Sequence, residues 1–125
     1  MARKKILVVD DDDIVRKTII NILELEGKYD IEEAQDGLIA EKKIEEFIPD
    51  LIILDIKMPN KDGYEVFWDL KKKPDKGHIK VIAVSGFSGQ IGGAIMDALG
   101  ADSFFEKPLD IKKFRERVNA LLKEE

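Results

Sequence analysis

Four short apolar runs in this chain each stop at a charged or hydroxyl residue, and this pattern constrains the fold more than any other feature. Three runs end at Asp10-Asp11, Asp55 and Ser85, and the fourth is followed by Glu106 and then Lys107. Parallel strands of one open sheet have their carboxyl ends side by side, at the edge where ligands bind. If the runs are such strands, the polar groups that follow them share one crevice, and the functional site is expected there.

Helix-like segments alternate with strand-like runs at a spacing of roughly 25 residues, the length of one βα unit. We expect strands at Lys5–Val9, Tyr29–Glu33, Asp50–Leu54, Val81–Val84 and Ser103–Phe105. We expect helices at Asp13–Glu26, Gly37–Phe47, Tyr64–Lys73 and Ile111–Leu122, and a short fourth helix that follows a glycine-rich loop and ends near Gly100. Right-handed crossovers then predict an α/β fold, a doubly wound parallel sheet of the flavodoxin-like (βα)5 kind, for which the strand order 2-1-3-4-5 is the natural choice.

Composition limits the chain to a few classes of protein. Its 125 residues suit one domain, and the absence of cysteine fits a reducing compartment. The net charge of -5 repels a phosphate backbone, so we expect no direct nucleic-acid binding. No apolar stretch approaches the roughly 20 residues of a membrane helix, so we expect a soluble, cytoplasmic protein with no membrane partner.

The acidic groups at the predicted strand ends indicate a cation site. Two like charges about 4 Å apart repel by about 4 kcal/mol at an effective dielectric of about 20, so Asp10, Asp11 and Asp55 in one crevice need protons or a cation. Oxygen ligands without histidine or cysteine favour Mg²⁺, with Mn²⁺ as the alternative. The next two aspartates suit a helix N-terminus, and we assign the helix cap to Asp13, with Asp12 as the alternative.

Asp55 follows four large aliphatic residues, so its carboxylate sits at a buried strand end and needs a partner. Such a carboxylate can act as a nucleophile and form an acyl phosphate. Phosphoryl transfer also requires positive charge and hydrogen-bond donors around the transferred oxygens. Lys107 and Ser85 offer an ammonium and a hydroxyl at matching strand ends, which makes phosphoryl transfer the predicted chemistry.

Taken together, these segments resemble the receiver domains of two-component response regulators, related to the chemotaxis protein CheY. The resemblance spans essentially the whole chain, through Ile6 to Asp11, Pro49 to Asp55, Met58-Pro59 with Asp62-Gly63, Val84-Ser85-Gly86 and Lys107-Pro108. It implies that Asp55 is the phospho-acceptor and that the Mg²⁺ ligands are Asp10, Asp11, Asp55 and the backbone carbonyl of Lys57. It also implies that Ser85 and Lys107 contact the phosphoryl oxygens and that the Lys107-Pro108 peptide is cis. A sensor histidine kinase or a phosphotransfer protein would be the donor.

The resemblance further implies a conformational switch. A phosphoryl group on Asp55 would draw Ser85 toward it, and Phe104 matches the switch aromatic of the family, although a phenylalanine there is equally typical of a core. The output face would be the fourth helix, the fifth strand and the fifth helix, which would act on an unknown downstream protein as a monomer or a phosphorylation-dependent dimer. The apolar Phe87 is expected to hinder water and to lengthen the phosphoryl lifetime.

Two other interpretations compete with this one. A haloacid-dehalogenase-like phosphohydrolase would use Asp10, which opens a D-x-D motif, but it leaves Asp55 without a role and such enzymes are generally longer. A pseudo-receiver would keep the fold as a binding module without phosphorylation, but its usual sign is a missing acidic or lysine position, and all are present. We therefore expect one receiver domain over 1–125, a phospho-acceptor rather than an enzyme. We expect no output domain in this chain, which is either a full-length single-domain regulator or a fragment.

Overall fold

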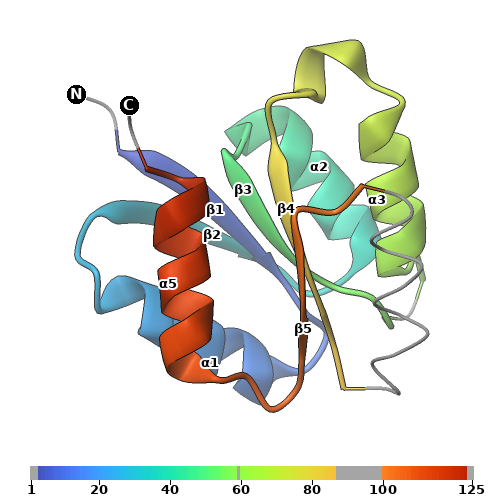
Figure 1. Cartoon of the computed structure of the whole chain (residues 1–125). Helices are drawn as coiled ribbons and strands as arrows, with labels where there is room; N and C mark the ends of the chain where they lie inside the picture. The colour runs from blue at the N-terminus through green and yellow to red at the C-terminus, as the bar shows by residue number, and fades with distance from the viewer. Residues whose placement is uncertain (1–2, 59, 87–99, 124–125) are drawn as a thin grey trace.

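The computed structural model describes residues 3–58, 60–86 and 100–123, and its elements are labelled in Figure 1. The strands form one parallel sheet in the order β2-β1-β3-β4-β5, which confirms the predicted fold class and order. The strands are β1 Lys4–Val9, β2 Tyr29–Ala34, β3 Leu51–Asp55, β4 Lys80–Ser85 and β5 Ser103–Glu106. The helices are α1 Asp13–Glu24, α2 Gly37–Phe47, α3 Gly63–Lys71 and α5 Ile111–Leu121, with a 3-10 helix at Pro74–Lys76.

Helices cover both faces of the sheet: α1 and α5 lie on one face, and α2 and α3 lie on the other (Figure 1). Side chains alternate along each strand, so neighbouring residues of β1 belong to different cores. Ile6 and Val8 pack in the cluster that contains Phe114 of α5, whereas Leu7 packs in the cluster that contains Phe67 of α3. Every residue of β3 is buried between the two cores, as its unbroken aliphatic run predicted.

Each of the four described α-helices begins after an aspartate whose side chain accepts N–H groups of the first turn. These caps are Asp12, Asp36, Asp62 and Asp110. The α1 cap is Asp12, the alternative that the sequence offered, and the assignment to Asp13 was wrong, because Asp12 accepts from the N–H groups of Ile14 and Val15 while Asp13 is already helical. An aspartate cap contributes about 1 kcal/mol relative to alanine, so these residues help to fix where each helix starts.

Three of the described helices are shorter than predicted, α5 by the single residue Leu122. α1 ends at Glu24 rather than Glu26, because Gly27 adopts a φ of 65° and its N–H donates to the Glu24 carbonyl at 3.0 Å. That left-handed turn cannot continue a right-handed helix, and glycine adopts it at little cost. α3 covers Gly63–Lys71 instead of Tyr64–Lys73, since its cap lies earlier and the chain then enters the 3-10 helix.

Residues 87–99 lie outside the part of the chain that the structure describes. The predictions that fall there concern the glycine-rich loop beyond Gly86, the effect of Phe87 on phosphoryl lifetime, and the short fourth helix. The output face that includes this helix therefore stays a prediction.

Candidate functional site

Two of the predicted acidic strand ends lie side by side at one edge of the sheet. In the register between β1 and β3, Val9 pairs with Leu54. Asp10 directly follows Val9, and Asp55 directly follows Leu54 and ends β3. The two aspartates therefore leave neighbouring strands at the same level, as expected from their positions after the apolar runs.

Ser85 and Lys107 complete the same edge of the sheet. Asp55 pairs with Val84, so Ser85, the buried last residue of β4, lies one residue beyond the acidic strand end. Lys107 follows β5, and its N–H donates to the Ser85 carbonyl at 2.8 Å. The peptide between Lys107 and Pro108 is cis, which confirms what the resemblance implied.

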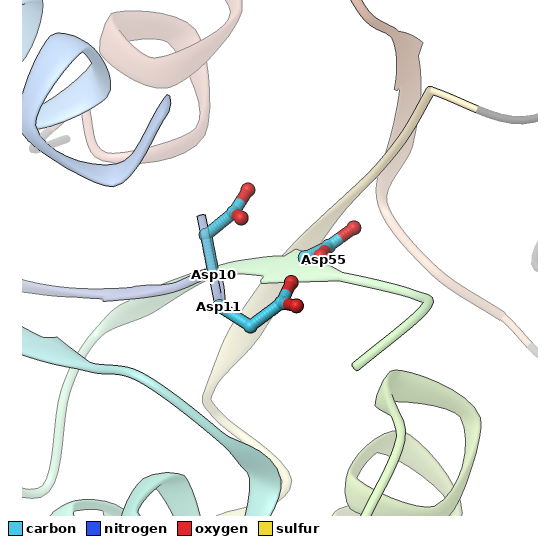
Figure 2. A group of neighbouring side chains, drawn as sticks. All are labelled: Asp10, Asp11 and Asp55. Carbon is cyan, nitrogen blue, oxygen red and sulfur yellow. The ribbon is translucent and has the colours of Figure 1, made fainter. Parts of the chain in front are cut away.

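Three carboxylates lie together, two just after β1 and one on the last residue of β3 (Figure 2). Asp10, Asp11 and Asp55 each offer an oxygen, and these oxygens lie within 4.8 Å of one another. Asp10 and Asp55 are buried, with 1% and 4% of their surface exposed, whereas Asp11 is exposed. The cluster is therefore closed on the side of the sheet and open on the side of Asp11, where an ion or a phosphoryl group can enter.

The ammonium of Lys107 contacts two of these carboxylates. Its Nζ lies 2.8 Å from Asp10 Oδ2 and 3.5 Å from Asp55 Oδ1. Burial disfavours the ammonium, but the carboxylates of Asp10 and Asp55 outweigh this cost, and the pKa of Lys107 is raised. The Lys107 ammonium therefore stays charged at neutral pH, beside three carboxyl groups that can each carry a negative charge.

The Asp55 carboxyl is difficult to ionise in this cluster. Burial raises the pKa of Asp55 to about 7; the charge of Asp10 adds to this effect and the charge of Lys107 opposes it. Near neutral pH the carboxyl therefore keeps a proton for part of the time unless a further cation balances its charge. A perturbed carboxyl in a partly open cleft is typical of a functional group.

The donor set fits a hard divalent cation. Asp10 Oδ1 accepts the Asp12 N–H at 2.9 Å. Asp10 Oδ2 is buried and accepts no regular hydrogen bond from the described residues; the ammonium of Lys107 lies 2.8 Å from it as an ion-pair partner. Oxygen-only ligands with one such unsatisfied oxygen suit Mg²⁺ or Mn²⁺.

The other predicted residues lie around this cluster. Lys57 is exposed, two residues after the end of β3, and the role of its backbone carbonyl stays a prediction. Phe104 of β5 is partly buried and packs against the core on the α2 and α3 side. Its role as a switch also stays a prediction, since its position suits both a core residue and a residue that moves.

Two residues that shape this site had no role predicted from the sequence. Arg16 of α1 is buried and donates to the Asp10 carbonyl at 2.8 Å. The spacing of Arg16 in the sequence could have indicated this role, since Arg16 lies about one helical turn before the buried Ile19 and so faces inward. Gly63 packs against β3 so closely that a β-carbon would lie 2.7 Å from the Cα of Ile56 and would collide with the Asp55 carbonyl. That contact joins residues from different elements, and the sequence marked Gly63 only as part of the Asp62-Gly63 pair in the family resemblance.

A parallel sheet in the order 2-1-3-4-5 with an acidic cluster and a lysine at its carboxyl edge defines a flavodoxin-like domain with its candidate site where open α/β sheets bind ligands. The profile of the response regulator receiver domain family matches residues 6–119. The chain belongs to this family, whose members are signalling phospho-acceptors, and it is the receiver domain of a response regulator. The haloacid-dehalogenase-like alternative is not favoured.

Curated relatives agree with this membership. The chain is 39% identical over 120 residues to the response regulator MprA of Mycobacterium sp. (strain KMS). The matched region covers 95% of this chain and 50% of that protein. It is 34% identical over 120 residues to the DNA-binding dual master transcriptional regulator RpaA of Synechocystis sp., with 95% and 49% covered. The chain spans about half the length of the curated relatives it matches.

Solved structures share the fold and the family. The signal receiver domain of a DNA binding response regulator protein from Colwellia psychrerythraea superposes with a TM-score of 0.91 at 27% identity, over 97% of this chain and 99% of that one. The CheY-like receiver domain protein from Methanospirillum hungatei superposes with a TM-score of 0.83 at 30% identity, over 95% and 93%. The predicted family and the phospho-acceptor switch class are thus confirmed.

Proposed function

We propose that Asp55 is the residue that accepts the phosphoryl group, with a phosphohistidine as the donor. The observation that carries this proposal is the buried Asp55 carboxyl, grouped with Asp10 and Asp11 and in contact with Lys107. Asp55 ends a central strand, and the cluster to which it belongs is open to an incoming group on the side of the exposed Asp11. Its raised pKa supports the assignment, since a carboxyl so poised is typical of functional sites.

In the proposed reaction an oxygen of Asp55 attacks the phosphorus of the donor. A P–O bond forms while the P–N bond to the donor histidine breaks, and the electron pair of that bond stays on the histidine nitrogen. Lys107 has its ammonium 3.5 Å from Asp55 Oδ1, and Ser85 offers a hydroxyl from the neighbouring strand end. We assign both to the phosphoryl oxygens, where charge is spread in the transition state.

We propose that Asp10, Asp11 and Asp55 hold Mg²⁺ or Mn²⁺, with the backbone carbonyl of Lys57 as a further ligand. When bound, the ion would neutralise the carboxylates and polarise a phosphoryl oxygen. The chain prepares the site by bonding one oxygen of Asp10 to the Asp12 N–H, so that the other oxygen, which contacts Lys107, is the one offered to the ion. Burial and the charge of Asp10 raise the pKa of Asp55. The Asp55 carboxyl therefore has to lose its proton before one of its oxygens can attack phosphorus.

An apolar groove beside the site is suited to the donor protein. It encloses about 290 Å³, and its lining includes Ile14 of α1, Ile111 of α5, Lys107 and Pro108. Ile14 is 79% exposed and Ile111 is 51% exposed, so the groove presents apolar surface to solvent. Lys107 belongs to both the groove and the acidic cluster, so a protein seated in the groove can bring a phosphohistidine to Asp55. We propose that its occupant is the phosphohistidine-bearing domain of a sensor kinase or phosphotransfer protein.

We propose that the output is read by a downstream protein at the face formed by the fourth helix, β5 and α5, with Ser85 and Phe104 as switch residues. The net charge of -5 supports a protein partner rather than nucleic acid for this domain. No helix within the described ranges is long and apolar enough to cross a membrane. The proposed chemistry is self-phosphorylation and self-dephosphorylation, without turnover of an external substrate.

Incubation with acetyl phosphate and Mg²⁺ tests the acceptor. Borohydride reduction converts an aspartyl phosphate to homoserine, which mass spectrometry then locates. We expect the product at Asp55, its loss in Asp55→Asn, and its retention in Asp30→Asn, which changes an exposed aspartate at the start of the edge strand β2. Modification of Asp10 would instead indicate a phosphohydrolase, and no modification despite Mg²⁺ binding would indicate a pseudo-receiver.

A further inference from the structure

Arg16 supports the acidic cluster from inside the protein. Only 6% of its surface is exposed, and it lies on the inner face of α1. Its Nη1 donates to the Asp10 carbonyl at 2.8 Å, its Nε to Glu33 Oε1 at 2.7 Å and its Nη2 to Asp13 Oδ1 at 2.6 Å. A buried arginine is rare unless it is paired, and here one of the three acceptors is the backbone of a proposed metal ligand.

The contact with Arg16 completes a set of hydrogen bonds that fixes the backbone of Asp10. The Asp10 N–H donates to the Ala34 carbonyl at 3.1 Å, and the Asp10 carbonyl accepts from Arg16. Because the peptide group is planar, the direction of that carbonyl sets the path of the chain into Asp11. Arg16 therefore bonds the carbonyl of the peptide group that links the two successive acidic residues.

Glu33 fastens Arg16 to the edge strand β2. Its Oε1 accepts from Arg16 Nε, and its Oε2 accepts from Lys17 Nζ at 2.7 Å. Hydrogen bonds from Lys17 and Arg16 lower the pKa of Glu33, so this anchor stays ionised at neutral pH. The next residue, Ala34, accepts the N–H of Asp10, so β2 holds Asp10 both directly and through Arg16.

We propose that Arg16 is a positioning residue that holds the Asp10-Asp11 peptide in the geometry that binds the divalent cation. This inference rests on the proposed function, because it requires the cation site. A planar guanidinium can donate to three acceptors in fixed directions, which a lysine ammonium cannot reproduce. Partners that orient metal ligands typically change metal affinity by about 10- to 100-fold when they are removed.

Because Arg16 is positively charged, the direction in which Mg²⁺ affinity changes when Arg16 is replaced tests the inference. Removing a positive charge near a cation site raises the affinity for Mg²⁺ if charge is all that matters. Loss of positioning lowers the affinity instead. Arg16→Met keeps an unbranched apolar side chain and removes the donors. Lys17→Met is the matched control, because it removes one charge from the adjacent residue, which also binds Glu33, without a contact to Asp10.

Calorimetric titration of the full chain with Mg²⁺ gives the dissociation constants, and urea unfolding verifies that each variant is folded. We expect Arg16→Met to bind Mg²⁺ about 10- to 100-fold more weakly than wild type, with Arg16→Lys in between. We expect Lys17→Met to bind as tightly as wild type or more tightly. These readouts do not depend on phosphorylation.

Unchanged or tighter Mg²⁺ binding by folded Arg16→Met would overturn the inference while leaving the proposed function intact. If Arg16→Met does not fold, Arg16→Lys decides the question, and wild-type affinity in that variant overturns the inference. Failure of the wild-type chain to bind Mg²⁺ would refute the cation site itself, and the inference with it.

Discussion

Lys107 Nζ lies closer to Asp10 Oδ2, at 2.8 Å, than to Asp55 Oδ1, at 3.5 Å. The lysine therefore neutralises the oxygen of Asp10 that accepts no regular hydrogen bond from the described residues and that suits a divalent cation. We infer that lysine and ion compete for Asp10 before phosphorylation. Once a phosphoryl group is present, its oxygens give the ammonium another partner, and the competition ends.

Removing Lys107 is expected to change ion binding and phosphorylation in opposite directions. Lys107→Met should bind Mg²⁺ several-fold more tightly, because a competing cation is gone. It should accept the phosphoryl group of acetyl phosphate about 100-fold more slowly, because a donor to the transition-state charge is gone. Calorimetry and the rate of aspartyl phosphate formation measure the two effects, with Lys80→Met, at the exposed start of β4, as the control. Weaker Mg²⁺ binding would contradict the competition.

The stability of the ion-free protein should depend on pH through Asp55. Its pKa is about 7 in the folded chain against an ordinary value of 3.8, so the folded state binds more protons than the unfolded state between these values. The stabilisation is fully present below the lower value and is lost as the pH rises through the higher one. The loss is on the order of 4 kcal/mol in the free energy of unfolding.

Urea unfolding of wild type and Asp55→Asn at about pH 5 and about pH 8, without divalent cations, measures the part of this loss that falls above pH 5, about 3 kcal/mol. Asp55→Asn has no carboxyl to deprotonate, so it should gain stability relative to wild type as the pH rises. Parallel pH profiles for the two proteins would show that Asp55 does not titrate in this range. Added Mg²⁺ should stabilise wild type more than Asp55→Asn at the higher pH, since it binds the folded state.

Gly63→Ala should destabilise the protein and disturb the acceptor. The new β-carbon would lie 2.7 Å from the Cα of Ile56 and would also collide with the Asp55 carbonyl, so β3 and α3 must separate. Such overpacking costs about 1 to 3 kcal/mol, and slower phosphorylation should accompany it. Gly77→Ala is the matched control, since its β-carbon would meet only the Pro74 carbonyl oxygen at 3.5 Å. Equal stability of the two variants would argue against the close contact.

A charge in the apolar groove should impair transfer from a protein donor only. Ile14→Asp should slow transfer from a phosphohistidine protein at least about tenfold, because docking would bury an unpaired carboxylate. Its reaction with acetyl phosphate should stay at the wild-type rate, since the small donor needs no docking surface. Leu38→Asp is the control, because Leu38 is also exposed, at 58%, but lies on α2 at the other face of the sheet. Equal transfer rates for the two variants would rule the groove out.

Much of the fold could be predicted from local patterns in the sequence. The aliphatic run before Asp55 predicted a strand buried on both faces, and the one-sided pattern of Tyr29–Glu33 predicted an edge strand. Element ends were less certain, because they depend on single residues such as Asp12, which caps α1, and Gly27, which ends it two residues early. Such ends are set by one hydrogen bond or one dihedral angle, which leaves little trace in a periodic pattern.

The sequence by itself determined which groups stand at the strand ends, because a strand that is buried on both faces has to stop where a charge begins. Only the tertiary structure decided that Lys107 contacts Asp10 more closely than Asp55, that Arg16 turns inward to the Asp10 carbonyl, and how strongly Asp55 resists ionisation. Strand patterns come from neighbours along the chain. Distances, burial and electric fields instead come from residues that are far apart in the sequence, and these appear only when the sheet has assembled.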